Sequence, residues 1–174
     1  MPDYADLRQA GYHYLLADAG IQALVASGAL GKDVPGGPWE QGWVFQGLEE
    51  IKPFRDVEGT GKSAIVLRVM DSWGQNKHNS ASFPTLQVLV WADPTRNADG
   101  STTARDATAK CEVVCRAVDR LLHDPANSRH IWPLGPSMGN LFVVACVRSA
   151  GPSIEEVPDS DGGCRGELRY EVSM

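Results

Sequence analysis

The chain has 174 residues, of which 43% are hydrophobic and 22% are charged, a composition typical of a globular protein with one substantial core. Its formal net charge of −6 argues against a general nucleic-acid-binding protein, which needs clustered lysines and arginines to neutralise phosphates. No apolar run is long enough to span a bilayer, and the N-terminus has neither the basic flank nor the apolar core of a signal peptide. We therefore expect one domain over residues 1–174, made and kept in a cytoplasm without membrane association.

The N-terminal segment predicts two short helices. One apolar stripe suits a first helix capped by Asp3, and its residues are Leu7, Ala10, Tyr14 and Leu15. A break is expected near residues 18–20. A second helix is predicted over residues 21–26, with Gly28 as its C-terminal stop.

Two segments are predicted to be extended loops. Residues 28–43 are rich in glycine and proline, and residues 71–82 join two apolar strands through a stretch rich in asparagine and serine. Tryptophans flank the end of the first loop. Large aromatic side chains on a loop anchor it either onto its own domain or onto a partner, and the sequence leaves both open.

The strongest strand signal lies in residues 83–92. Apolar side chains alternate there so that both faces are largely apolar, which predicts a strand buried on both sides. Asp93-Pro94 ends this strand, because proline cannot donate to a ladder. A second strand is predicted over residues 64–70 and a short one over residues 43–48.

A long amphipathic helix follows the turn at residues 97–100. Its apolar positions recur at spacings of three and four and are Ala107, Cys111, Val114, Val118, Leu121 and Leu122. Ser101, Thr102 or Thr103 is expected to cap this helix. Residues 124–127 are expected to end it.

The C-terminal part predicts two further strands. Residues 131–139 form a short segment closed by prolines and glycines, and residues 141–148 predict a third buried strand. An acidic loop is expected from Gly151-Pro152 to residue 161. Residues 165–172 alternate charged and apolar side chains, which predicts a strand with one dry and one wet face. The resulting fold class is α+β: two layers, with a mostly antiparallel sheet on which the long helix and the N-terminal helices pack.

Neither the cysteines nor the histidines predict a chemical centre. Buried thiols acting as small hydrophobes account for Cys111, Cys115 and Cys146, while a metal or disulfide framework is the lesser alternative. Cys164, in a glycine-rich segment, is expected to be a free exposed thiol. No two of the four histidines have the spacing of a metal-binding helix, so we expect no metal, no cofactor and no catalytic residue.

Residues 56–63 resemble a phosphate-binding loop, but two features argue against that function. Asp56 stands where the motif requires its first glycine. A β-branched run follows the motif, whereas phosphate binding needs a helix N-terminus there. The segment is therefore predicted to be a glycine hairpin turn between two strands.

Several short stretches carry a family resemblance. They are RDVEGTG at 55–61, NKHN at 76–79, FPTLQV at 83–88, WADPTR at 91–96 and RYEV at 169–172. Over roughly residues 40–172 the chain resembles tail terminator proteins of long-tailed phages of actinobacterial hosts.

The resemblance implies a non-enzymatic virion protein of the tail neck, assembled in the host cytoplasm. Such proteins form a ring, expected to be a hexamer, that ends tail-tube polymerisation and joins the tail to the head connector. The implied partners are further copies of the chain, the tail tube protein and a connector or stopper protein, and genome DNA passes through the lumen without specific binding. The expected contact residues lie in the two loops and are Trp39, Trp43, Trp73, Asn76, Lys77, His78 and Asn79.

Two other functions fit the same residues. The chain could be another neck component, such as a stopper or head-closure protein, which position in the virion would distinguish. It could also be a small nucleotide-binding enzyme built on the turn at 59–63, which would show ligand-dependent thermal stabilisation.

Overall fold

The computed structural model describes residues 4–25, 44–46, 59, 61, 63–70, 84–103, 105–124, 130–135 and 138–174. The loops expected at 28–43 and 71–82 therefore lie outside the described residues. So do all seven expected contact residues, namely Trp39, Trp43, Trp73, Asn76, Lys77, His78 and Asn79.

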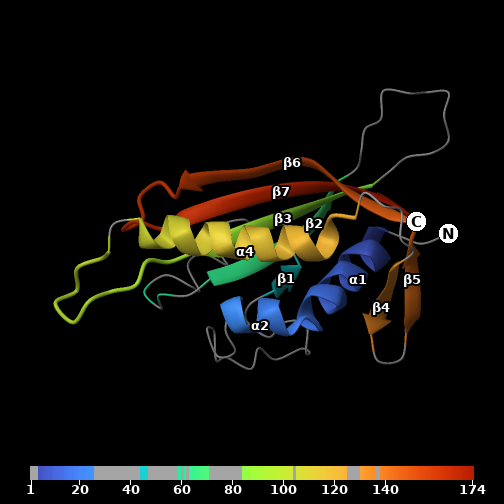
Figure 1. Cartoon of the computed structure of the whole chain (residues 1–174), viewed down its shortest axis with the longest axis horizontal. Coiled ribbons are helices and arrows are strands. Elements are labelled where there is room, and N and C mark those ends of the chain that lie inside the picture. The colour runs from blue at the N-terminus through green and yellow to red at the C-terminus, as the bar shows by residue number, and fades with distance from the viewer. Residues whose placement is uncertain are drawn as a thin grey trace.

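The described elements form two layers. In chain order they are α1 (Tyr4–Leu16), α2 (Ala19–Val25), β1 (Val44–Gln46), β2 (Ser63–Met70), β3 (Thr85–Ala92), α4 (Asp106–Leu122), β4 (His130–Gly135), β5 (Gly139–Val143), β6 (Ala145–Glu156) and β7 (Cys164–Ser173). Five strands form one sheet in the order β1-β2-β3-β7-β6, and the helices lie on one of its faces (Figure 1). Only the β1–β2 pair is parallel among the paired strands described. The predicted α+β class with a mostly antiparallel sheet is confirmed.

Strand β3 occupies the centre of this sheet, and its burial on both faces is confirmed. Leu86 and Val90 face the main core beneath the helices. Leu89 and Trp91 face the opposite side, where they pack in a second cluster with Val66. Because β2 and β7 pair with β3 along its whole length, both edges of β3 are covered as well as its two faces.

Helix α4 lies very close to β7. Its buried stripe includes Cys111 and Cys115, and a Cβ added at Gly166 would lie 2.8 and 2.7 Å from their sulfurs. Real Cβ atoms do not approach other atoms so closely, so only glycine allows this packing. The long amphipathic helix is confirmed, with glycine at the point of closest approach.

The four thiols are free and buried, which corrects the expectation of an exposed Cys164. The alternation of β7 turns Cys164 toward the helix, where its Sγ lies 3.1 Å from Thr108 Oγ1. Burial raises the pKa of Cys146 to about 12, which keeps that thiol protonated and unreactive at neutral pH.

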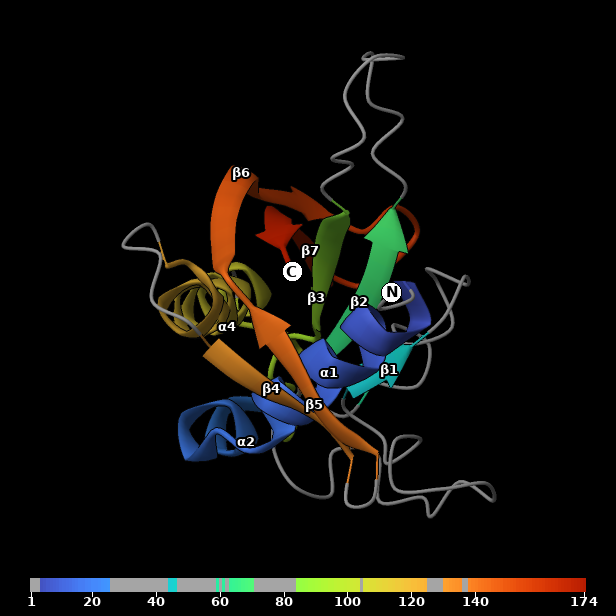
Figure 2. The ribbon, with the colours of Figure 1, turned by 90° about the vertical axis from the view of Figure 1, so that its right-hand side faces the viewer.

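The break between the N-terminal helices is confirmed. Asp18 begins α2, because its Oδ1 accepts the backbone N–H of Ile21 at 2.8 Å. Tyr12 is fully buried, whereas Tyr14, expected on the apolar stripe, is half-buried against the hairpin of β4 and β5. Figure 2 shows this hairpin lying across α1, apart from the main sheet.

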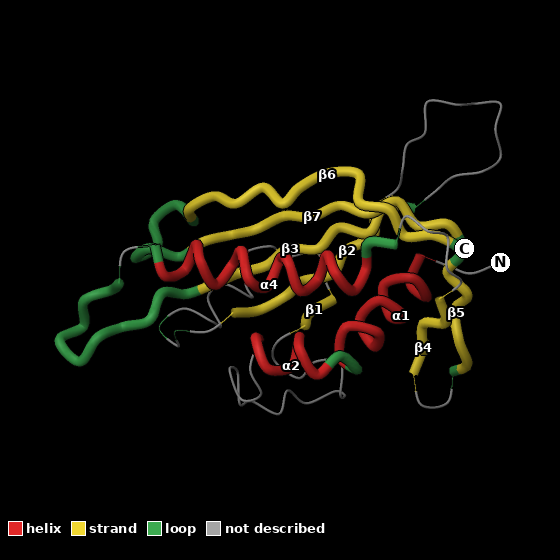
Figure 3. The backbone as a smooth tube through the Cα atoms, viewed as in Figure 1, coloured by secondary structure: helices red, strands yellow, loops and turns green. Residues whose placement is uncertain are grey.

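Two expectations for the C-terminal part are wrong. Residues 141–148 are not one buried strand, because the chain leaves β5 at Val144 and enters β6 at the edge of the main sheet. The acidic loop expected from residue 151 is instead strand β6 as far as Glu156, since residues 153–156 pair with β7. Figure 3 shows β6 running beside β7 along most of its length.

Candidate functional site

Two of the resembling stretches contact each other at the C-terminal end of β3, through Gly61 and Asp93. The backbone N–H of Gly61 donates to Asp93 Oδ2 at 2.8 Å, although the two residues are 32 positions apart. Arg96 donates to Asp161 Oδ2 at 2.9 Å, which ties the same end of β3 to the turn before β7. Asp93 is buried. We name this arrangement the β3 junction.

The β3 junction also settles the geometry of the phosphate-loop-like segment. Ser63 begins strand β2 rather than a helix, and the Gly61 amide is already bound by a carboxylate. The predicted change from turn to strand is therefore confirmed. Residues 47–58, 60 and 62 lie outside the described residues, so the predicted hairpin turn between two strands stays a prediction.

Lys110 closes the β3 junction from α4. Its ammonium donates to Gly61 O at 2.7 Å, to Asp93 O at 3.0 Å and to Thr95 Oγ1 at 2.8 Å. It also pairs with Asp106 Oδ2 at 2.9 Å. Because its donors are directed at these oxygens, this lysine joins the helix to the end of β3 and is not free to act as a nucleophile.

The start of α4 differs from the prediction of a Ser or Thr cap. Arg105 precedes the helix with a φ of 66°, and no side chain makes a capping hydrogen bond there. Asp106 lies in the first turn, where a carboxylate interacts favourably with the helix dipole. Hydrogen bonds from Lys110 and from the backbone of Thr95 lower the pKa of Asp106 to about 2, so this carboxylate is ionised at neutral pH.

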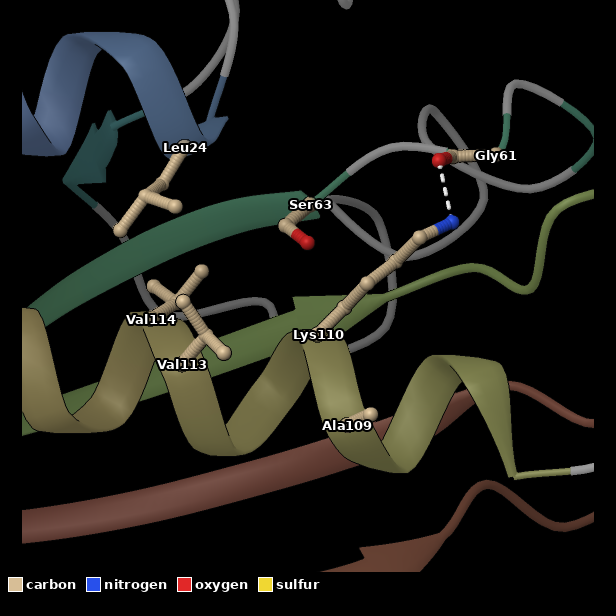
Figure 4. Close-up of a pocket in the computed structure, with 7 residues that line it drawn as sticks. All are labelled: Leu24, Gly61, Ser63, Ala109, Lys110, Val113 and Val114. Atoms are coloured by element: carbon tan, nitrogen blue, oxygen red, sulfur yellow. Dashed lines mark hydrogen bonds between the residues drawn. The ribbon is translucent and has the colours of Figure 1, made fainter.

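An open pocket lies beside the β3 junction, between α2 and α4. Its volume is about 400 Å³. Its lining is Leu24, Gly61, Ser63, Ala109, Lys110, Val113 and Val114 (Figure 4). Leu24 and Val113 are 37% and 45% exposed, and the Lys110 ammonium is directed at Gly61 O. We name this cavity the α2–α4 pocket; its accessible walls are mainly aliphatic.

The hairpin of β4 and β5 buries only its inner face. Trp132 is 1% exposed, and its ring stacks on Tyr14 with centroids 5.1 Å apart. On the outer face Ile131 lies directly opposite Phe142, and these side chains are 56% and 65% exposed. Val144 follows two residues later and is 45% exposed. We name these three exposed residues, Ile131, Phe142 and Val144, the hairpin ridge.

The face of the sheet opposite the helices carries charges that pair with one another. Arg165 lies over the ring of Trp91, 5.8 Å from its centroid, and binds Glu155 on the neighbouring strand. Arg169 binds Glu167 at 2.6 Å. Because Arg165 and Arg169 each have an acidic partner, these two residues do not offer the unpaired positive charge that phosphate binding needs.

The described histidines have local partners. His130 Nε2 lies 2.5 Å from Asp124 Oδ2, and His123 Nδ1 accepts the backbone N–H of Arg148 at 3.0 Å. Among the described residues, no group of three or more His, Cys, Asp or Glu side chains could hold a metal ion. In that same part of the chain, no helix is long and apolar enough to cross a membrane.

The sequence did not predict either the hairpin ridge or the Lys110 contacts. Apolar residues on both sides of the glycine and proline cluster at 133–139 are a hairpin signal that could have indicated β4 and β5. Nothing local indicates the partners of Lys110, because Gly61 and Asp93 reach it only through the fold.

No known protein family matches the chain, and no curated protein matches it either. Among solved structures it is similar to a chain described as "Virion of native gene transfer agent (GTA) particle", with 16% sequence identity and a TM-score of 0.47. The alignment covers 95% of this chain and 92% of that chain. At this identity and TM-score, the likeness supports no inference about the function of this chain.

Proposed function

We propose that this chain is a structural virion protein that caps the tail tube of a long-tailed phage as a ring. The ring ends tube polymerisation and provides the surface that joins the tail to the head connector. It comprises several copies, six by the resemblance, each a single domain over residues 1–174. Assembly takes place in the host cytoplasm.

The observation that carries this proposal is the resemblance of five short stretches to tail terminator proteins, two of which lie side by side at the β3 junction. The stretches at 55–61 and 91–96 resemble tail terminator proteins, and Gly61 and Asp93, one from each, are joined by a buried carboxylate. Ser63 pairs with Ala92, so the contact between Gly61 and Asp93 follows from the antiparallel pairing of β2 with β3. The α+β fold with helices on one face of the sheet is compatible with the fold that the resemblance implies.

The surfaces of the chain fit this role. A ring closes through heterologous contacts, in which two different patches of the same chain meet. The hairpin ridge is an exposed apolar patch beside polar surface, as assembly interfaces commonly are. On the opposite side of the sheet, Arg165 and Arg169 pair with acidic side chains. DNA passing along such a face would therefore not be bound tightly through its phosphates. The loop residues Trp39, Trp43, Trp73, Asn76, Lys77, His78 and Asn79 remain proposed contacts with neighbouring copies or with the tube.

The decisive experiment is particle assembly without this chain. If the chain ends tube growth, its loss leaves overlong tail tubes and heads that carry no tails, and supplying the chain in trans restores tails of normal length. Electron microscopy of the products measures both tube length and joining. Tails of normal length that fail to join heads would instead indicate a stopper or head-closure protein, and normal joined particles would exclude all of these roles.

A further inference from the structure

We propose that the hairpin ridge of one copy inserts into the α2–α4 pocket of the next copy, and that this contact builds the ring. The inference rests on the proposed function, because a ring needs a repeated contact between two different patches. It adds the identity of both patches and of the side chains that meet.

The ridge is suited to be the inserted partner. Phe142 is the most exposed large hydrophobic side chain among the described residues, and Ile131 lies directly opposite it. The inner face fixes the ridge in place, since Trp132 is buried and stacks on Tyr14. Because the strand that carries Phe142 is held in place, binding does not have to order its backbone, which favours an aromatic side chain as an interface anchor.

The pocket is suited to receive it. Its volume of about 400 Å³ leaves room for an aromatic ring together with an aliphatic side chain, and Leu24 and Val113 present apolar walls. The one charged group in the lining is Lys110, whose ammonium is held by Gly61 O and Asp93 O. Insertion of an apolar ridge therefore leaves no charged group buried without a partner, which would otherwise oppose binding.

The positions of the two patches favour a second copy as the occupant. Figure 1 shows the hairpin at one end of the helical layer, beyond α1, with α2 and the first half of α4 toward the other end. A projecting apolar patch and an apolar hollow on separate parts of one chain generate a head-to-tail contact that repeats. A ridge pairing with another ridge would give a two-fold dimer and leave the pocket unused.

Net charge adds a condition to this contact. Each copy carries a formal charge of −6, so copies repel one another at long range and the contact between them must be mainly apolar. Salt screens such repulsion, and we therefore expect self-association to strengthen as ionic strength rises.

The test is a photo-crosslinking experiment on assembled particles. The photoreactive analogue p-benzoylphenylalanine replaces Phe142 in the full chain, and a matched chain carries it at Met70, which is exposed on the main sheet. Irradiation of the position-142 particles should join copies in a ladder, with the crosslinks mapping by mass spectrometry to Leu24 or to residues 109–114. The position-70 particles should give no crosslink to those residues.

The other outcomes distinguish the two proposals. Crosslinks from position 142 to the tube protein, to another virion protein or to the ridge of a second copy would overturn this inference and leave the proposed function standing. A chain absent from the tail would overturn the proposed function, and with it this contact. As a second readout, Phe142→Asp should remain folded yet lower ring incorporation by about tenfold or more, whereas Val147→Asp, at a residue of β6 that is 38% exposed, should not.

Discussion

The main sheet and the β4–β5 hairpin both contain strands with alternating apolar side chains, but they differ in how many faces of those strands are buried. In β3 both faces are buried: one lies beneath the helices, and on the other Leu89 and Trp91 pack with Val66 and Val157 in a second apolar cluster. In the hairpin only the face toward α1 is buried, and Ile131 and Phe142 remain more than half exposed on the other. Alternation alone does not distinguish a core strand from an interaction surface; the tertiary contacts made by each face decide.

This difference predicts where the chain tolerates change. Substitutions in the main sheet should act on the free energy of unfolding, since that sheet organises the core of the described chain. Substitutions on the outer face of the hairpin should act on assembly and leave folding almost unchanged. The predictions below test this division, beginning with the largest effect.

Leu168→Ala should destabilise the chain strongly. Leu168 is fully buried on β7 beneath α4, and removing a core leucine side chain costs about 2–5 kcal/mol through lost burial and the cavity that remains. Urea unfolding followed by circular dichroism measures this loss. The matched control is Leu24→Ala, because Leu24 is 37% exposed and its removal leaves no enclosed cavity. Equal losses for the two variants would contradict the assignment of β7 to the core.

Gly166→Ala should also destabilise, by about 1–3 kcal/mol, because the added methyl group overpacks the contact between α4 and β7. The nearest obstacle is Cys115 Sγ, 2.7 Å from the new Cβ, followed by Cys111 Sγ at 2.8 Å. A double variant that adds Cys115→Ala removes the first sulfur and should recover part of the loss, so the two free-energy changes should not add. Strictly additive values would show that the helix moves freely away from the strand.

Asp106→Asn should have a smaller effect that depends on pH. Hydrogen bonds from Lys110 and Thr95 lower the pKa of Asp106 from 3.8 to about 2 in the folded chain. The stabilisation from the carboxylate is therefore fully present above the unfolded pKa and is lost as pH falls toward 2. Urea midpoints of the original and Asn chains should differ by a constant amount near neutrality and converge between about pH 4 and pH 2.

The control for this prediction is Asp161→Asn. Asp161 binds Arg96 but its side chain is 64% exposed, and an exposed ion pair of this kind contributes little because water screens it. A difference for Asp106→Asn that persisted unchanged at the lowest pH would mean that its charge is not what holds α4 to the end of β3.

The elements that the sequence predicted well have a burial pattern that repeats along their own length. The stripe of α4, the two apolar faces of β3 and the dry and wet faces of β7 all follow from local periodicity. Their partners lie on either side for most of their length, so local pattern and tertiary environment agree.

The run at 141–148 shows where this reasoning stops. Its sequence predicts one buried strand, yet Val143 and Cys146 are buried while Phe142 and Val144 are exposed. The chain passes from the hairpin to the main sheet at Val144, and no local signal marks a change of sheet. Similarly, Lys110 resembles a solvated helix residue until the fold brings Gly61 and Asp93 within reach of its ammonium. Contacts between distant segments decide both cases.

Phe142→Ser should change the free energy of unfolding least, by no more than about 0.5 kcal/mol, because surface substitutions away from structural contacts are nearly neutral. The expected difference between the two faces is large, because removing a phenylalanine side chain from an inner face would cost about 3–5 kcal/mol. Leu141→Ala provides the matched comparison, since Leu141 is the next residue along β5 but is only 5% exposed, opposite the buried Trp132. Urea unfolding of the two variants at low protein concentration, where copies do not associate, measures the difference between the two faces of one strand. A Phe142→Ser chain destabilised as much as the Leu141→Ala chain would show that the outer face contributes to the core within a single copy, and the division between folding and assembly surfaces would then be wrong.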